Sequence, residues 1–262
     1  MATKHPHPRK GHPLSRAELR KFNGQGALYE FLDYYAQHDT FFRSWDFEGD
    51  AFGADFWAVA NGGGAAAVSF ATNVQRSGVI RATTGTANDA TASSSIISPA
   101  IYYGDANCGC EFHWKPITAV TETRIEQGFV DVVPSSNASV VATLITPTVN
   151  ASIVDAAVQV YNHTGSTTTN QLTTIGTTIA AVKTTYTPPV AIAATTYNWI
   201  RLQLLTNQVL LWMDGVLVAK HNDGTTNYIE GGSALALFAY IRANNATSKS
   251  LDLDFVGAWQ DR

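Results

Sequence analysis

The segment Asn198–Lys220, with the sequence NWIRLQLLTNQVLLWMDGVLVAK, decides how this chain folds. It places Asp214-Gly215 between two apolar runs, and Asp-Gly is the strongest short-range signal for a two-residue hairpin turn, because both central residues need φ > 0. The run before it alternates apolar and polar residues: Ile200, Leu202 and Leu204 against Arg201 and Gln203. Such alternation puts one face of a strand in a core and the other in water. The segment therefore predicts three consecutive antiparallel strands, as in a two-sheet sandwich.

The rest of the chain after residue 40 carries the same kind of signal. Short runs rich in Val, Ile, Thr and aromatic residues are separated by Gly, Asn, Asp and Pro. They predict strands at 41–47, 56–60, 66–71, 79–83, 95–97, 108–115, 123–133, 151–161, 171–174, 198–205, 209–213, 216–221, 234–243 and 250–260. The segment 180–196 contains Pro188-Pro189 and little periodicity, which predicts a long surface connection between sheets. With 262 residues, the chain is long enough for one large sandwich.

The segment around residues 198–220 resembles the laminin-G and concanavalin-like jelly-roll domains, in which a Trp-x-x-Leu strand precedes a strand that ends in Asp-Gly. The closing segment Ser250–Trp259 extends the likeness, with Leu251, Leu253 and Phe255 alternating with Asp252 and Asp254; so does the opening WDFEG at residues 45–49. The threonine- and alanine-rich layout looks most like the domains of bacteriophage virion proteins such as tail fibres, head fibres and capsid decorations. The resemblance covers residues 41–262 and implies an all-β, two-sheet antiparallel jelly-roll sandwich.

Residues 1–40 differ from this body and are predicted to form a basic extended arm with one or two short helices. The whole chain has a formal net charge of −4. The arm, however, carries six cations against Glu18: Lys4, Arg9, Lys10, Arg16, Arg20 and Lys21. Such an arm either stays solvated or binds nucleic acid, an acidic protein surface or another copy of the acidic body. We expect it to anchor the protein to a virion or a neighbouring subunit, without nucleic-acid specificity.

Two amphipathic helices are predicted to follow the arm. Ser15 and Glu18 form a capping box that starts the first helix, which ends near Gly24. The second runs from about residue 26 to residue 38, because four apolar residues share one stripe: Leu28, Phe31, Leu32 and Tyr35. This stripe packs either on the sandwich of its own chain or on a neighbouring subunit or virion shell. The spacing does not decide between these two partners.

The two cysteines are predicted to be buried thiols. In CGCEFHWK, Cys108 and Cys110 share a strand face with Phe112 and Trp114, whereas His113 points the other way. A disulfide across one glycine would be strained, and a metal would need ligands from both faces. We therefore expect no metal and no cofactor. The sequence has no apolar run long enough to span a membrane and no signal peptide, which predicts no membrane partner and synthesis in the host cytoplasm.

Some concanavalin-like proteins are glycoside hydrolases, so the acidic residues need attention. Laminarinase-type enzymes carry Glu-x-Asp-x-x-Glu, and the resemblance would place such acids in a groove as nucleophile and general acid. Here Glu48-Gly49-Asp50 is followed by Gly53, so the motif is broken. Asp252 and Asp254 lie on one strand face, either as solvated carboxylates or, with Asp214 or Asp223, as calcium ligands. Because the Glu-x-Asp-x-x-Glu motif is broken, the sequence predicts a protein without enzymatic activity.

Aromatic residues are the candidates for contacts with glycan or protein. Trp114, Trp199 and Trp212 lie among apolar neighbours and are predicted to be core residues. Four tyrosines near predicted loops are the better contact candidates: Tyr102, Tyr103, Tyr197 and Tyr228.

Taken with the resemblance, the sequence predicts a non-enzymatic bacteriophage structural protein, a capsid decoration or head-fibre protein located on the virion. It would form a homo-oligomer and bind a major capsid protein or a tail or fibre protein. The alternative is a carbohydrate-binding tail or baseplate module that recognises a host polysaccharide. A third hypothesis, a glycosidase, depends on Glu48 and Asp50.

Overall fold

The computed structural model describes residues 40–45, 57–61, 67–70, 78–86, 93–131, 155–176, 179–222, 228–229 and 233–261. In this part of the chain, the secondary structure is β-strand apart from the 3-10 turn η1 (Gly104–Ala106). The strands are β1 (Thr40–Trp45), β2 (Trp57–Asn61), β3 (Ala67–Phe70), β4 (Ile80–Thr83), β5 (Ser93–Tyr103), β6 (Gly109–Pro116), β7 (Thr123–Val130), β8 (Ala156–Thr164), β9 (Thr167–Gly176), β10 (Ile179–Thr185), β11 (Asn198–Leu205), β12 (Gln208–Met213), β13 (Val216–Asn222), β14 (Ala234–Ala243) and β15 (Ser250–Asp261). Within these ranges, no helix is long and apolar enough to cross a membrane.

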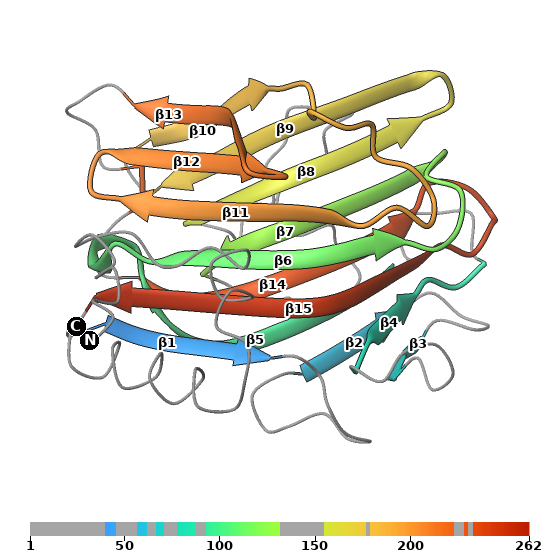
Figure 1. The fold of residues 1–262 in the computed structure, drawn as a ribbon, viewed down its shortest axis with the longest axis horizontal. Helices are drawn as coiled ribbons and strands as arrows, with labels where there is room; N and C mark the ends of the chain where they lie inside the picture. Colours follow the sequence, from blue (N-terminus) through green and yellow to red (C-terminus); the bar gives the residue numbers. More distant parts are fainter. Residues whose placement is uncertain are drawn as a thin grey trace, which may run out of the picture.

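The described strands form two antiparallel sheets that lie one behind the other (Figure 1). The eight-stranded sheet has the order β13-β12-β11-β6-β15-β4-β3, and β1 also pairs with β15. The seven-stranded sheet has the order β10-β9-β8-β7-β14-β5-β2. Neighbouring strands are often distant in sequence, because the chain crosses repeatedly from one sheet to the other. The predicted all-β, two-sheet jelly-roll sandwich is confirmed.

The hairpin that the sequence predicts is present between β12 and β13. Asp214 and Gly215 have φ values of 49° and 83°, so both central turn residues occupy the left-handed region that this turn requires. The Asp214 carboxylate also accepts a 2.9 Å hydrogen bond from the backbone N–H of Trp199 at the start of β11. The turn residue therefore ties the hairpin to the next strand of the sheet.

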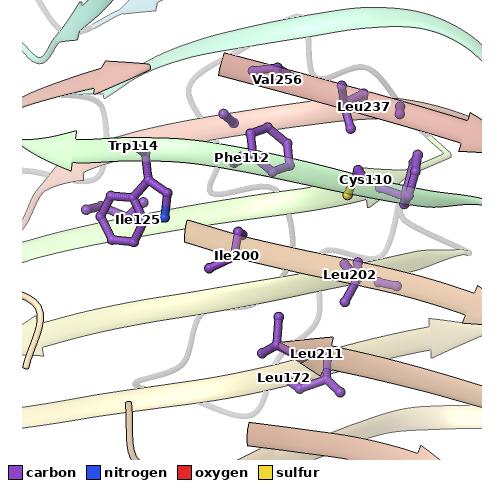
Figure 2. Close-up of a cluster of buried hydrophobic side chains, with 14 of the residues drawn as sticks. Cys110, Phe112, Trp114, Ile125, Leu172, Ile200, Leu202, Leu211, Leu237 and Val256 are labelled. Carbon is purple, nitrogen blue, oxygen red and sulfur yellow. The ribbon is translucent and has the colours of Figure 1, made fainter. Parts of the chain in front are cut away.

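The main core lies between the two sheets and is built from residues that alternate along each strand (Figure 2). Cys110, Phe112 and Trp114 of β6 and the alternate residues Ile200 and Leu202 of β11 are fully buried. They meet Ile125, Leu172 and Leu237 of the opposing sheet. The predictions for these positions are confirmed. Burial also raises the pKa of both free thiols, Cys108 and Cys110, well above the ordinary cysteine value.

The prediction of one long connection over residues 180–196 is wrong in its first part. That part belongs to β10, an edge strand that pairs with β9. Its sequence, IAAVKTT, shows little alternation of apolar and polar residues, so the pattern alone did not predict a strand. The remaining residues do cross to the eight-stranded sheet, and Tyr186 and Ile192 hold this crossing by packing into the core.

Several predictions concern residues outside the described part of the chain. These are the basic arm, the two helices and the apolar stripe of the second helix, together with the division of the chain at residue 40. They remain predictions from the sequence.

Candidate functional site

One face of the eight-stranded sheet points away from the seven-stranded sheet and carries many aromatic and charged side chains. It arises from the alternation that builds the core: residues between the buried positions of β6 and β11 must point outward. In register, Arg201 lies opposite Glu111 and Trp212, and Trp199 lies opposite His113. We call this surface the aromatic-ionic face and define it by Arg81, Glu111, His113, Lys115, Tyr197, Trp199, Arg201, Trp212, Asp252, Asp254 and Trp259.

A β-bulge in β15 places Asp254 on this face. Leu253 pairs with Trp114 and Phe255 pairs with His113, so Asp254 is the extra residue. After the bulge, the alternation is shifted and Phe255 faces outward. The predicted alternation of β15 is therefore wrong at Phe255. Bulges re-aim side chains and are frequent beside functional sites.

Asp254 orients the imidazole of His113. Its Oδ2 lies 2.5 Å from Nδ1 of His113. The His113 ring stacks on Tyr197, with 4.4 Å between ring centroids and 17° between planes, and the Lys115 Nζ lies 4.4 Å from the same tyrosine centroid. Since Nδ1 is engaged, Nε2 is the His113 nitrogen left to meet a ligand. Within the described residues, the Tyr197 hydroxyl and the Trp199 indole N–H make no hydrogen bond.

Arg201 lies between two tryptophans. The Cζ atom of its guanidinium is 5.4 Å from the ring centroid of Trp212 and 5.1 Å from that of Trp259, which is cation-π range. Its Nε lies 3.8 Å from Glu111 Oε1. Gly109 makes room for the Trp259 indole, because a Cβ there would lie only 2.3 Å from its Cζ2 atom. A charge flanked by rings is thus held in a fixed orientation.

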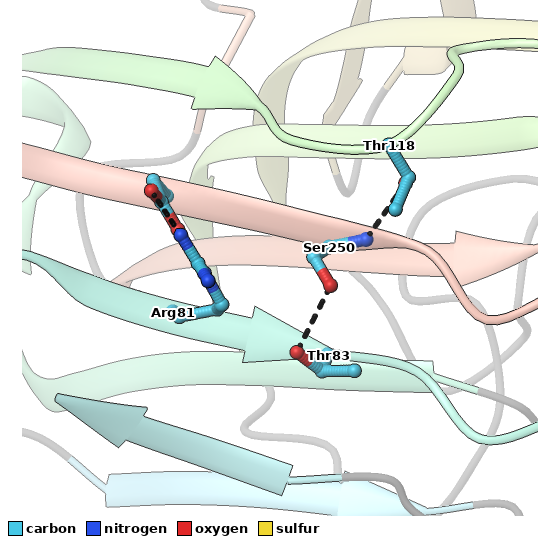
Figure 3. Close-up of polar contacts among 5 residues, drawn as sticks. Arg81, Thr83, Thr118 and Ser250 are labelled. Atoms are coloured by element: carbon cyan, nitrogen blue, oxygen red, sulfur yellow. Dashed lines mark hydrogen bonds and ion pairs between the residues drawn. The ribbon is translucent and has the colours of Figure 1, made fainter. Parts of the chain in front are cut away.

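Asp252 is held by two hydrogen bonds from Arg81 (Figure 3). The Arg81 Nε and Nη2 atoms donate to the two carboxylate oxygens over 2.7 and 2.9 Å. Next to this pair, Ser250 joins β15 to its neighbours: its hydroxyl lies 3.1 Å from that of Thr83, and its N–H donates to Thr118 over 3.1 Å. Paired hydrogen bonds of this kind fix both position and direction of the charged groups.

The interpretation of Asp252 and Asp254 as solvated carboxylates is wrong. They are only 2% and 5% exposed, and each has a cationic or imidazole partner. The calcium alternative also lacks support, because Asp214 belongs to the hairpin turn and the described residues contain no metal-binding group of three His, Cys, Asp or Glu. Asp223 lies outside the described residues. The acids of this face serve to hold other side chains.

This arrangement leaves aromatic and cationic groups as the exposed chemistry of the face. Glu111, like Asp252 and Asp254, is buried, at 4% exposed. By contrast, the side chains of Arg81, His113 and Arg201 are 31%, 17% and 16% exposed. Aromatic rings beside oriented N–H groups provide stacking surfaces and hydrogen-bond donors, the combination that fits a ligand with flat apolar faces and many oxygen atoms.

The outer face of the seven-stranded sheet offers much less. Among its described strand residues, Glu126 is the one carboxylate; it is fully buried and ion-paired with Arg124. Glycoside hydrolysis by the usual route needs two carboxyl groups on either side of the bond that is cleaved. Glu48 and Asp50, the acids of the broken motif, lie outside the described residues.

The four tyrosines predicted as contact residues have different surroundings. Tyr102 and Tyr228 are 0% and 7% exposed and belong to the core, contrary to the prediction that they lie near the surface. Tyr103 is 42% exposed and Tyr197 is partly exposed, so a contact role for these two stays a prediction. Only Tyr197 among the four lies on the aromatic-ionic face.

Two of the three tryptophans predicted as core residues are not in the core. Trp114 is fully buried, as predicted, but Trp199 and Trp212 lie outside the core and are partly exposed. The sequence could have predicted this, because Trp199 and Trp212 alternate with core residues of their own strands and must therefore face outward. His113, Arg201 and Trp259 were missed because the site depends on cross-strand register, which one strand does not reveal.

Comparisons with known proteins support the fold class. No protein-family model and no curated protein sequence matches this chain. A solved structure of a protein of unknown function from Shewanella oneidensis MR-1 is similar, with 13% identity, a TM-score of 0.56, and 85% of this chain and 87% of that chain covered. The carbohydrate recognition domain of Emp47p is also similar, with 9% identity, a TM-score of 0.54, and 83% and 93% covered. The catalytic domain of an endo-1,3-β-glucanase (laminarinase) from Thermotoga petrophila RKU-1 shares 12% identity and a TM-score of 0.55, with 86% and 99% covered.

These similarities agree with a concanavalin-like jelly-roll fold. They also contradict the prediction of a non-enzymatic protein, because most of the similar structures are glycan-cleaving enzymes, including further glucanases and a structure reported with endo-acting O-glycanases. At sequence identities this low, the similarities show the fold and do not show an activity of this chain. The resemblance is therefore supported for the fold, and these structures do not show its bacteriophage part.

Proposed function

We propose that this protein recognises a polysaccharide of a bacterial host surface through the aromatic-ionic face. The observation that carries the proposal is the placement of Arg201 between Trp212 and Trp259, next to the stacked pair His113 and Tyr197. Buried carboxylates hold these groups before a ligand arrives, which lowers the entropy cost of binding. The carbohydrate recognition domain and the glucanases among the similar folds add support for a glycan ligand.

A polysaccharide array tests this proposal. The wild-type protein is expected to bind at least one bacterial surface polysaccharide, and Trp212→Ala should weaken that binding about ten-fold or more, since aromatic anchors dominate such contacts. Val190→Ala is the control, because Val190 is 53% exposed and lies in the connection between the sheets. Release of reducing ends from the bound polysaccharide measures cleavage in the same samples. Unchanged binding by Trp212→Ala would contradict the proposal.

The second part of the proposal concerns location. The sequence resemblance favours a bacteriophage particle, where a homo-oligomer bound to a capsid, tail or fibre protein would strengthen weak glycan contacts by avidity. The basic residues 4–21 are the proposed attachment segment. The protein should copurify with virions in fixed stoichiometry, and deletion of residues 1–21 should abolish this association. Retention of the shortened protein on the particle would argue against this attachment.

A further inference from the structure

We infer that the aromatic-ionic face selects acidic glycans, polysaccharides whose sugars carry carboxylate groups, such as uronic or sialic acids. This inference rests on the proposed function and names its class of ligand. It depends on which charges of the face are buried, which are paired, and which remain for a ligand.

The negative charges of the face are withdrawn from the surface. Glu111, Asp252 and Asp254 are each at most 5% exposed and lie against Arg201, Arg81 and the His113 ring, in that order. A ligand that approaches the face therefore meets the partners of these acids before the acids themselves. Repulsion of an anionic sugar is reduced accordingly.

Lys115 is a cation of this face that lies beside the stacked rings of His113 and Tyr197. Asp252 lies directly opposite it in the β6–β15 register, but both oxygens of Asp252 accept hydrogen bonds from Arg81. Within the described residues, Lys115 has no carboxylate partner, and its ammonium rests over the Tyr197 ring. A cation-π contact leaves ammonium protons free to donate, so Lys115 can still bind a carboxylate.

The groups around Lys115 fit the remainder of a sugar ring. Tyr197 stacks on the His113 ring, and Trp199 lies opposite His113 in the register of β11 and β6. The Tyr197 O–H and the Trp199 indole N–H make no hydrogen bond in the described structure. Both polar atoms are almost inaccessible to solvent, so the two residues offer the exposed parts of their rings to a ligand. Lys115, His113, Tyr197 and Trp199 thus combine one carboxylate site with an imidazole nitrogen and aromatic surface.

Matched polysaccharides separate charge from shape. Polygalacturonate and hyaluronate are each compared with their carboxyl-reduced forms, which keep the chain but lose the charge, by calorimetry at low salt. The native forms should bind about ten times more tightly, because the reduced forms lose the charge-assisted hydrogen bond to Lys115. Added sodium chloride should weaken the native forms selectively.

Variants assign the effect to Lys115. Lys115→Gln should lower affinity for the native forms about ten-fold and leave the reduced forms unchanged. Lys183→Gln, the same charge change on β10 of the other sheet, should change neither. Acid preference that survives in Lys115→Gln would overturn the assignment to this residue. If the wild type binds native and reduced forms equally and Trp212→Ala binds neither, the acidic-glycan inference is overturned. The proposed function would then still stand. If neither these polysaccharides nor any member of the array binds, the proposed function itself fails.

Discussion

Protonation of one histidine inside the sandwich should make the protein less stable in mild acid. His221 of β13 is 3% exposed and reaches the opposing sheet. Its Nδ1 lies 2.6 Å from the Thr174 hydroxyl on β9, and its Nε2 lies 3.0 Å from the Thr184 hydroxyl on β10. The Tyr228 ring contacts the imidazole at 5.7 Å between centroids. His221 therefore connects the edges of the two sheets in its neutral form.

The size of the effect follows from the pKa. Burial lowers the pKa of His221 from 6.5 to about 4, because the charged imidazolium loses its water. Between these values the unfolded chain binds more protons than the folded chain, so stability is complete above pH 6.5 and is lost as the pH falls toward 4. The full difference corresponds to about 3 kcal/mol, and about 2 kcal/mol of it is lost by about pH 4.5, where the folded imidazole is still mostly neutral.

Urea unfolding at pH 7 and at about pH 4.5 measures this loss, with His221→Gln as the reference that does not titrate. Other acids and histidines titrate equally in both proteins. The free energy of unfolding of the wild type should therefore fall by about 2 kcal/mol more than that of His221→Gln. Parallel pH dependence in the two proteins would refute the assignment of the pKa shift to this buried ring.

Three further predictions concern the core and the aromatic-ionic face. Cys108 and Cys110 are fully buried with raised pKa values, so neither thiol should react with a thiol reagent in the native state and both should react in urea; rapid native labelling would contradict their burial. Gly109→Ala should displace the Trp259 indole, lower stability by about 1 to 3 kcal/mol and weaken glycan binding, whereas an unchanged melting temperature would show that the ring has room. Asp252→Asn should cost about 2 kcal/mol in urea unfolding because it removes one partner of a mostly buried ion pair. Asp105→Asn, at an exposed residue of η1, is its control and should change stability little.

The fold was predictable because its local signals agree with its long-range pairing. The Asp214-Gly215 turn, the alternation in β11 and the cysteine-containing strand β6 each determine a face or a hairpin without knowledge of the partner strand. The weak edge strand β10 was not predictable in this way, since only its pairing with β9 defines it.

The candidate site was predictable only in part. Alternation identifies His113 and Arg201 as outward residues, but nothing in their own strands shows that Asp254 and Trp259, more than fifty residues later, will lie beside them. The bulge at Asp254 adds a local shift that strict alternation does not anticipate. Sites built across strands depend on register, and register is a property of the assembled sheet.

The most direct measurement is a titration of the ¹⁵N-labelled protein with an acidic oligosaccharide, followed through the indole N–H signals of its six tryptophans. Signals of Trp199 and Trp212 should shift in a saturable manner. The signal of Trp114, fully buried between the sheets, should stay in place as the internal reference. Saturable binding that leaves Trp199 and Trp212 unshifted would contradict a glycan site on the aromatic-ionic face.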